Sequence, residues 1–147
     1  MGRPGTAPTR LRPLTDEELQ GALRERLPRI GPVRVGDRHI FKRRRDWRGE
    51  RLFERVDVER RGAPRLELCL KYFAPGPGDG RPGERAAREA AAYRFLNERS
   101  AAGAPACFGV VEAPGSRGRV LLLEYVRGRR LKKTTDPATW LETARWL

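Results

Sequence analysis

The sequence predicts a small α+β domain, with a mostly antiparallel sheet of about five strands and one helix packed across it. Val56 and Val58 repeat at a spacing of two within residues 52–59, and residues 66–73 form a second strand pattern. The turn Arg61-Gly-Ala-Pro64 separates the two segments, which predicts a hairpin. An alanine-rich helical stretch follows at residues 84–99. Two more apolar strands, at residues 107–111 and 120–126, favour an antiparallel sheet over alternating βαβ units.

The amino-terminal elements follow from local signals. Residues 1–13 contain Arg, Gly and Pro but no apolar segment, so we expect a disordered basic arm without a secretory signal. A capping-box pattern begins at Thr15, and apolar residues then recur at helical spacing until Pro28. We therefore expect an amphipathic helix within residues 14–30.

Length and composition exclude several classes of protein. The 147 residues fit one domain, and the longest strongly apolar stretch has four residues, whereas a membrane-spanning helix needs about 20. We expect a cytoplasmic protein without a membrane span. His39 is the only histidine, and with Cys69 and Cys107 it makes neither a four-ligand zinc set nor a histidine-dependent triad.

The formal net charge is +13, and 28 of the 32 basic residues are arginines. Basic clusters at residues 42–51 and 127–133 could neutralise phosphates, so a nucleic-acid or phosphate-surface binding module is one candidate function. Only Trp47 interleaves with the first cluster as a stacking side chain. We therefore expect the arginines at residues 43–45 to be solvent-exposed and to contribute little to folding.

Lys71 stands inside an otherwise apolar strand, on the same face as Cys69 and Phe73. Taken alone, it could be an edge-strand lysine that faces water. Glu89 lies in an apolar helical stripe that includes Ala86, and its carboxylate either reaches solvent at the helix edge or meets a cation. An unpaired buried charge is costly, so we expect Lys71 and Glu89 to form an ion pair within about 4 Å.

Apolar residues 120–123 give way abruptly to Glu124 and Tyr125, and Gly128 follows soon after. This change marks the point at which the backbone leaves a buried strand. The exposed backbone there is either a plain strand end or an edge that hydrogen-bonds a flat heterocycle.

Together these residues resemble the amino-terminal lobe of the protein-kinase-like fold, especially its aminoglycoside and choline phosphotransferase branch. The resemblance covers about residues 53–147 and rests on three motifs in order: Cys69-Leu-Lys71, Arg88-Glu89 followed by Tyr93 and Leu96, and Leu122-Leu-Glu-Tyr-Val126-x-Gly128. It implies a nucleotide-binding lobe over residues 31–131. Residues 132–147 would then begin a linker helix toward a carboxyl-terminal lobe that we expect to be missing from this chain.

The resemblance implies that the chain binds ATP. Lys71 would hold the α- and β-phosphates and Glu89 would orient Lys71, because phosphoryl transfer needs positioning and charge neutralisation. Mg²⁺ would find its ligands in the missing lobe.

The resemblance also implies where the adenine would lie. Cys69 would contact its face, and Leu123 would occupy the gatekeeper position beside it. The carbonyl of Glu124 and the N–H of Val126 would pair with the edge of the base.

Two family features are missing. A glycine-rich phosphate loop should precede residues 52–59, yet Gly49 is the only glycine in residues 43–50. The catalytic histidine, aspartate and asparagine loop belongs to the carboxyl-terminal lobe, and the residues after His39 do not replace it. We therefore expect a phosphotransferase fragment that binds ATP without transferring phosphate to the hydroxyl of its small-molecule acceptor.

Residues 78–83 match the dinucleotide-binding pattern G-x-G-x-x-G. That pattern needs a tight turn from strand to helix, and residues 74–77 separate the strand from the first glycine. We favour a flexible linker over a dinucleotide site.

Overall fold

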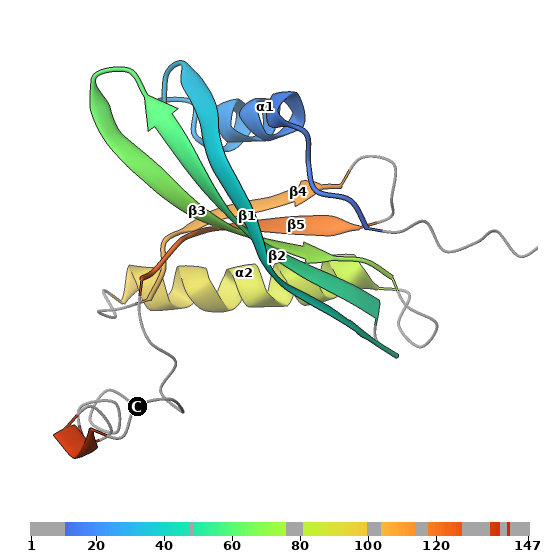
Figure 1. The fold of residues 1–147 in the computed structure, drawn as a ribbon. Coiled ribbons are helices and arrows are strands. Elements are labelled where there is room, and N and C mark those ends of the chain that lie inside the picture. Colours follow the sequence, from blue (N-terminus) through green and yellow to red (C-terminus); the bar gives the residue numbers. More distant parts are fainter. Residues whose placement is uncertain are drawn as a thin grey trace, which may run out of the picture.

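The computed structural model describes residues 11–47, 49–75, 81–99, 104–113, 118–127, 136–138 and 141. The described residues form a five-stranded antiparallel sheet, which confirms the predicted α+β class and the antiparallel sheet. Figure 1 shows helices packed on both faces of this sheet. The elements, in chain order, are α1 (Asp16–Arg26), β1 (Val33–Asp46), β2 (Gly49–Arg60), β3 (Ala63–Phe73), α2 (Pro82–Glu98), β4 (Cys107–Glu112) and β5 (Arg119–Glu124).

The sheet has the strand order β1-β2-β3-β5-β4, and every neighbouring pair is antiparallel. A dinucleotide-binding unit needs adjacent parallel strands around a crossover helix, so that interpretation of residues 78–83 is wrong. Gly78 and Gly80 themselves lie outside the described residues. The order also makes β3 the central strand, with β2 on one side and β5 on the other.

Strand β1 is longer than the sequence pattern indicates. It pairs with β2 from Val33 opposite Arg60 to Asp46 opposite Gly49, with two irregularities in register. Most side chains in its second half are exposed, so no alternation of apolar and polar residues marks it. Backbone pairing with β2 makes this segment a strand.

The two-residue period of β3 divides the core into two parts, as the sequence predicts. Leu68, Leu70 and Tyr72 belong to a larger core on the α1 side, which includes the buried α1 residues Leu19 and Leu23. The other side of β3 meets α2. There the buried members are Phe73, Ala86, Ala90, Leu121 and Leu123.

Helix α1 begins with the expected capping box. The Glu18 N–H donates to the Thr15 hydroxyl at 3.2 Å, and the Thr15 N–H donates to the Glu18 carboxylate at 2.8 Å. Leu11 was expected to lie in a disordered arm, but its side chain is only 2% exposed and its N–H donates to Glu50. The prediction of disorder is therefore wrong at Leu11, because the core on this face takes its side chain. Residues 1–10 lie outside the described residues.

A buried carboxylate joins α1 to the sheet. Glu54 on β2 is 2% exposed and accepts two hydrogen bonds from Arg38, at 2.7 and 2.9 Å, and one from the Tyr72 hydroxyl at 2.8 Å. The Tyr72 oxygen accepts the Leu14 N–H, and Arg38 also pairs with Asp16 of α1. Burial raises the pKa of Tyr72 well above its ordinary value, and the Glu54 charge adds to this effect. Every polar head in this buried group therefore has a partner.

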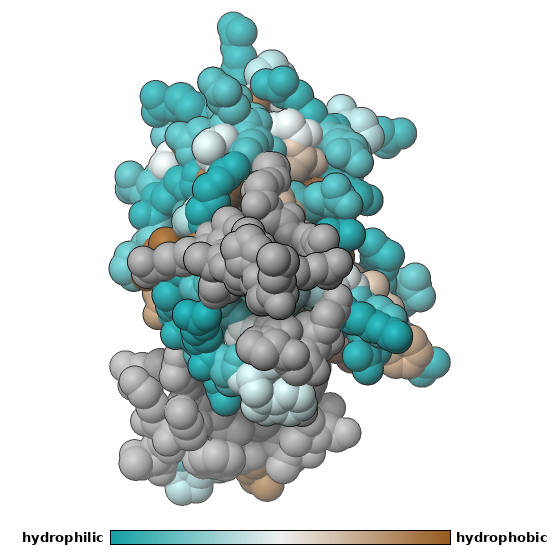
Figure 2. Space-filling model, turned by 90° about the vertical axis from the view of Figure 1, so that its right-hand side faces the viewer, coloured by the Kyte–Doolittle hydropathy of each residue, from teal (hydrophilic) through white to brown (hydrophobic). Residues whose placement is uncertain are grey.

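No helix among the described residues is long and apolar enough to cross a membrane. Outside the grey atoms, the side of the molecule seen in Figure 2 is mostly hydrophilic, with small separate hydrophobic areas.

Near the carboxyl terminus, Asp136 accepts the Ala138 N–H at 3.1 Å, and Pro137 and Ala138 are helical, within the range of the expected linker helix. The rest of the expected linker helix lies largely outside the described residues.

We expect Tyr72→Phe to lower the free energy of unfolding by about 1–2 kcal/mol, because it leaves the buried Leu14 N–H without its acceptor and Glu54 without one donor. Urea denaturation measures the change. The matched control is Tyr93→Phe, a half-buried tyrosine whose hydroxyl has no hydrogen bond among the described residues, and its effect should stay below about 0.5 kcal/mol. Equal effects of the two variants would contradict the role of the Glu54 group.

Candidate functional site

Lys71 projects from the central strand toward α2. It lies opposite Phe53 of β2 and Leu121 of β5, so strands flank it on both sides. The alternative of an edge-strand lysine is therefore wrong. A lysine in the middle of a covered sheet face needs a counter-charge close by.

Glu89 of α2 supplies that charge. The Lys71 Nζ lies 2.6 Å from both oxygens of the Glu89 carboxylate, which confirms the predicted ion pair. The side chains are 17% and 27% exposed, so the pair is partly buried but still reached by solvent. Ala86 and Ala90 are buried on the same helix. These small residues let α2 pack closely enough for Glu89 to meet the strand.

Two aromatic rings flank the Lys71 ammonium. Its Nζ lies 5.4 Å from the centroid of the Phe53 ring and 5.1 Å from that of Phe73, within the range of cation–π attraction. The sequence placed Phe73 on the Lys71 face but assigned neither ring a role. Phe53 lies opposite Lys71 in the pairing of β2 with β3, and this register is known only from the structure.

Cys69 and Leu123 lie one step along the sheet from Lys71. Leu123 pairs with Cys69 on one side and with Cys107 of β4 on the other, and it is buried against α2. Burial raises the pKa of the Cys69 thiol above its ordinary value, and the nearby Lys71 charge only partly opposes this effect. The thiol is therefore protonated at neutral pH and forms an apolar wall beside the ion pair.

The chain leaves the sheet just after Leu123. Strand β5 ends at Glu124, two residues before the predicted end, and the Tyr125 N–H makes a last bond to the Glu67 carbonyl at 2.9 Å. The Glu124 side chain accepts the Ala106 N–H at 3.1 Å. Val126 is exposed, and its N–H has no hydrogen bond among the described residues. Gly128, expected to end this hinge, lies outside them.

A hairpin turn between β1 and β2 occupies the place of the expected glycine-rich loop. Gly49 has a φ of +124°, a conformation that favours glycine. Arg43, Arg44 and Arg45 of this hairpin are exposed, as predicted. Arg43 pairs with Glu50, and Arg44 and Arg51 both pair with Asp46. The cluster is thus partly neutralised by its own acids.

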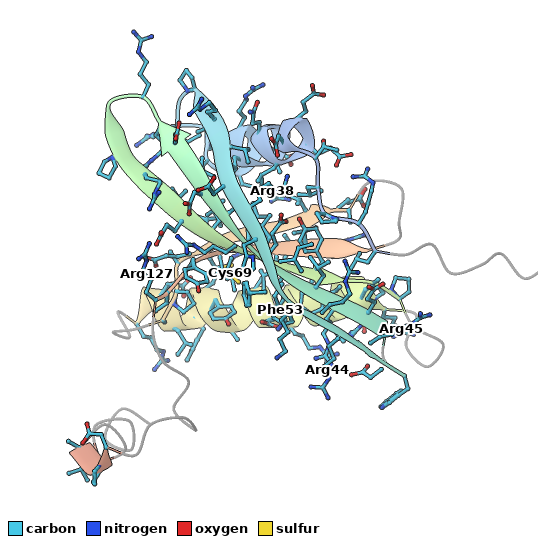
Figure 3. All side chains as sticks on the ribbon, in the orientation of Figure 1. Arg38, Arg44, Arg45, Phe53, Cys69 and Arg127 are labelled. Atoms are coloured by element: carbon cyan, nitrogen blue, oxygen red, sulfur yellow. The ribbon has the colours of Figure 1, made fainter. Side chains whose placement is uncertain are left out.

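Figure 3 shows the relation of these parts: Phe53 and Cys69 lie in the middle of the sheet, between Arg127 on one side and the hairpin arginines on the other. Arg127 follows the hinge and pairs with both oxygens of Glu67 on β3. Hydrogen bonds from Arg127 lower the pKa of Glu67 to about 2, and Arg55 contributes to this shift. Glu67 thus ties the segment after the hinge to the central strand. The other members of the second basic cluster lie outside the described residues.

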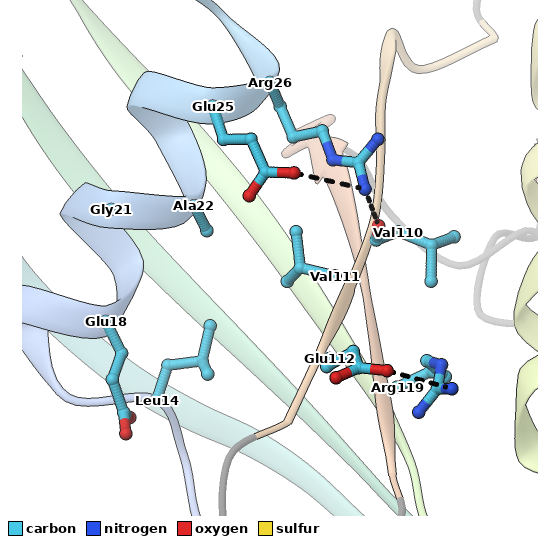
Figure 4. A pocket seen from close by; sticks show the side chains of 10 residues that line it. All are labelled: Leu14, Glu18, Gly21, Ala22, Glu25, Arg26, Val110, Val111, Glu112 and Arg119. Carbon is cyan, nitrogen blue, oxygen red and sulfur yellow. Dashed lines mark hydrogen bonds and ion pairs between the residues drawn. The ribbon is translucent and has the colours of Figure 1, made fainter.

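The described part of the chain also has cavities, and two of them lie on the α1 side, away from Lys71. The one in Figure 4 separates α1 from β4 and has a volume of about 610 Å³. Arg26 crosses it to donate to the Val110 carbonyl at 2.7 Å, and Glu112 pairs with Arg119 on its other side. Glu112 and Arg119 neutralise each other, and Glu25 and Arg26 bring opposite charges to the same lining, so the cavity has little net charge with which to select a ligand.

Comparison with protein-family models, with curated proteins and with solved structures gives no match for this chain. The geometry around Lys71 and Glu89 therefore carries the functional argument.

We expect a strong energetic coupling between Lys71 and Glu89. A double-mutant cycle with Lys71→Met and Glu89→Gln should give about 1–2 kcal/mol of coupling by urea denaturation, because the pair is partly buried and both carboxylate oxygens are engaged. The reference pair is Arg34 with Glu59, whose side chains are 77% and 51% exposed. Its coupling should stay below about 0.5 kcal/mol, and a value as large as that of the first pair would contradict the special role of Lys71.

We also expect Glu67 to stay ionised until the pH falls to about 2, because Arg127 stabilises its charged form. Stability from this contact is present at neutral pH and is lost as the pH falls from the ordinary value of 4.5 toward 2. Side-chain carboxyl ¹³C shifts measure the titration. Arg127→Ala should raise the pKa of Glu67, whereas Arg24→Ala on α1 should not change it. An unchanged Glu67 titration in Arg127→Ala would show that the contact does not form in solution.

Proposed function

We propose that this chain binds adenine nucleotide as the amino-terminal lobe of a kinase-like phosphotransferase that acts on a hydroxyl of a small molecule. The observation that carries the proposal is the ion pair of Lys71 with Glu89, which joins the central strand of an antiparallel sheet to the helix packed across it. A strand lysine held by a helix glutamate is the arrangement that kinases use to place the phosphates of ATP.

The surroundings of Lys71 suit a phosphate contact. Glu89 and the Phe53 and Phe73 rings hold the ammonium group in place without covering it completely, since the side chain keeps 17% of its exposure. A phosphate that approaches from the open side would meet a cation already positioned. In this proposal Lys71 contacts phosphate oxygens, and Glu89 and the rings are positioning groups.

The adenine would lie at the other end of the same sheet face. Cys69 and Leu123 provide an apolar wall there, and the backbone of Glu124 and Val126 provides the polar edge. The Val126 N–H has no partner among the described residues, so it can donate to a ring nitrogen. An apolar wall with a few backbone donors and acceptors is typical of a nucleotide-base site.

The hairpin arginines favour this proposal over a nucleic-acid binding module. Arg43, Arg44 and Arg51 have carboxylate partners that a phosphate chain would need to displace. Releasing those pairs would offset part of the gain from neutralising phosphates.

We propose nucleotide binding without turnover for the isolated chain. Among the described residues, no group of three or more carboxylate, cysteine or histidine side chains is placed to hold a metal ion, and Glu89 is occupied by Lys71. No histidine-x-aspartate segment occurs in the 147 residues. Mg²⁺ would therefore reach this site mainly through the phosphates themselves.

The test is a calorimetric titration with ATP and Mg²⁺, together with an assay for ATP hydrolysis. We expect weak binding that Lys71→Ala weakens at least about tenfold, since a charge-assisted contact to phosphate contributes about 1.5–3 kcal/mol. No hydrolysis should be detected. Equal affinity in Lys71→Ala, or robust turnover, would overturn the proposal.

Two further variants make this titration decisive. Arg24→Ala removes one positive charge from an exposed position on α1, across the sheet from Lys71, and should leave the affinity unchanged. Lys71→Ala leaves the Glu89 charge without a partner and could unfold the domain. The double variant Lys71→Met with Glu89→Gln removes both charges and leaves neither unpaired, so it should fold. It should also lose ATP binding.

A further inference from the structure

A second cavity opens on the α1 side of the sheet, at the place where α1 ends. Its volume of about 490 Å³ lies within the range of about 300–1,000 Å³ that is typical of ligand sites. We call it the arginine-rimmed slot. Its apolar lining consists of Leu27, Pro28, Ile30, Leu66 and Phe108, and its charged lining consists of Arg26, Arg29 and Arg60.

The turn after α1 forms one wall of the slot. The Leu27 N–H closes the helix on the Leu23 carbonyl at 2.8 Å, and the Ile30 N–H bonds the Leu27 carbonyl at 2.8 Å. Gly31 then turns the chain into β1 with a φ of +74°, which a residue with a side chain would adopt only under strain. This wall is therefore formed by the protein's own backbone bonds and needs no ligand to shape it.

The apolar lining is only partly covered. Leu27, Leu66 and Phe108 pack against the larger core from its outer side, and each keeps part of its surface exposed. Pro28 is exposed beside them. Contiguous exposed apolar surface with a charged rim marks an interaction site.

The rim carries positive charge that the protein leaves largely uncompensated. No acidic residue lines the slot. Arg26 donates to a backbone carbonyl of β4, and its acidic neighbour Glu25 lies 3.9 Å away, close to the limit for an ion pair. Arg60 donates to a backbone carbonyl at 2.8 Å, and Arg29 has no ion pair among the described residues. Arg43, Arg44 and Arg51 of the β1–β2 hairpin, in contrast, have carboxylate partners.

We propose that the arginine-rimmed slot binds an acidic peptide segment of a partner protein, with an apolar side chain in the slot and carboxylates on the rim. Arginine pairs with carboxylates through directed hydrogen bonds, and clusters of arginines recognise acidic motifs. A fatty acid would bring one carboxylate, whereas the three guanidinium groups come from the end of α1, the following turn and β2. A peptide with several carboxylates along its chain can pair with all three guanidinium groups. The slot lies across the sheet from Lys71, so it stands independently of nucleotide binding.

The test uses a fluorescein-labelled peptide, Asp-Glu-Leu-Phe-Asp-Glu, and fluorescence anisotropy at physiological salt. Two matched peptides separate the contributions: Asn-Gln-Leu-Phe-Asn-Gln lacks the charges, and Asp-Glu-Ala-Ala-Asp-Glu lacks the apolar side chains. We expect the first peptide to bind the intact chain and each matched peptide to bind at least about fivefold more weakly. The proposal would be overturned if the alanine peptide bound as tightly as the first peptide, or if the first peptide did not bind.

Two charge-reversal variants separate the slot from the general positive charge. Arg29→Glu should lower the affinity for the first peptide at least about tenfold. Arg45 is an exposed arginine of the β1–β2 hairpin, and Arg45→Glu should change this affinity less than twofold. Arg29 makes no described ion pair, so its variant should fold, and circular dichroism checks this. Equal weakening in both variants would show unspecific attraction to a basic protein. Displacement of the peptide by anionic lipid vesicles, or self-association that Arg29→Glu abolishes, would assign the slot to a membrane surface or to a second copy and would overturn the peptide proposal.

Discussion

The fold depends on one constraint, which is that the central strand β3 is covered on both faces. Its even-numbered residues fill the core on the α1 side, and its odd-numbered residues face α2. A charged residue on such a strand is largely shielded from bulk water, so it needs a counter-charge close by. Lys71 is such a residue, and the Glu89 carboxylate, 2.6 Å from the Lys71 Nζ, supplies the counter-charge. The position of α2 across the sheet and the chemistry of the candidate site follow from the same contact.

The opposite face follows the same rule with the signs exchanged. There the buried charge is the carboxylate of Glu54, and Arg38 and Tyr72 satisfy it with three hydrogen bonds. This group also ties the segment before α1 to the sheet through Leu14. Each helix is therefore joined to the sheet by apolar packing and by polar contacts that include a buried or partly buried charge, and these contacts favour one register because hydrogen bonds are directional.

The high arginine content has a structural explanation over much of the described chain. Arginines on the strands pair with acids of the neighbouring strand, as Arg34 does with Glu59 and Arg43 does with Glu50. Such exposed pairs contribute little to stability individually, but they reduce repulsion in a protein with a net charge of +13. The net charge alone therefore does not identify a partner. The informative arginines are those whose carboxylate partners are missing, such as Arg29 at the slot.

The sequence by itself determined the two faces of β3, the capping box of α1 and the ion pair of Lys71 with Glu89, because these depend on local periodicity and on the cost of burying one charge. Only the tertiary structure decided the length of β1, the burial of Leu11 and the rings that flank Lys71. The exposed half of β1 has no apolar pattern, and backbone pairing with β2 alone makes it a strand. The contact of Phe53 with Lys71 requires the register between two strands, and the sequence contains no local signal for that register.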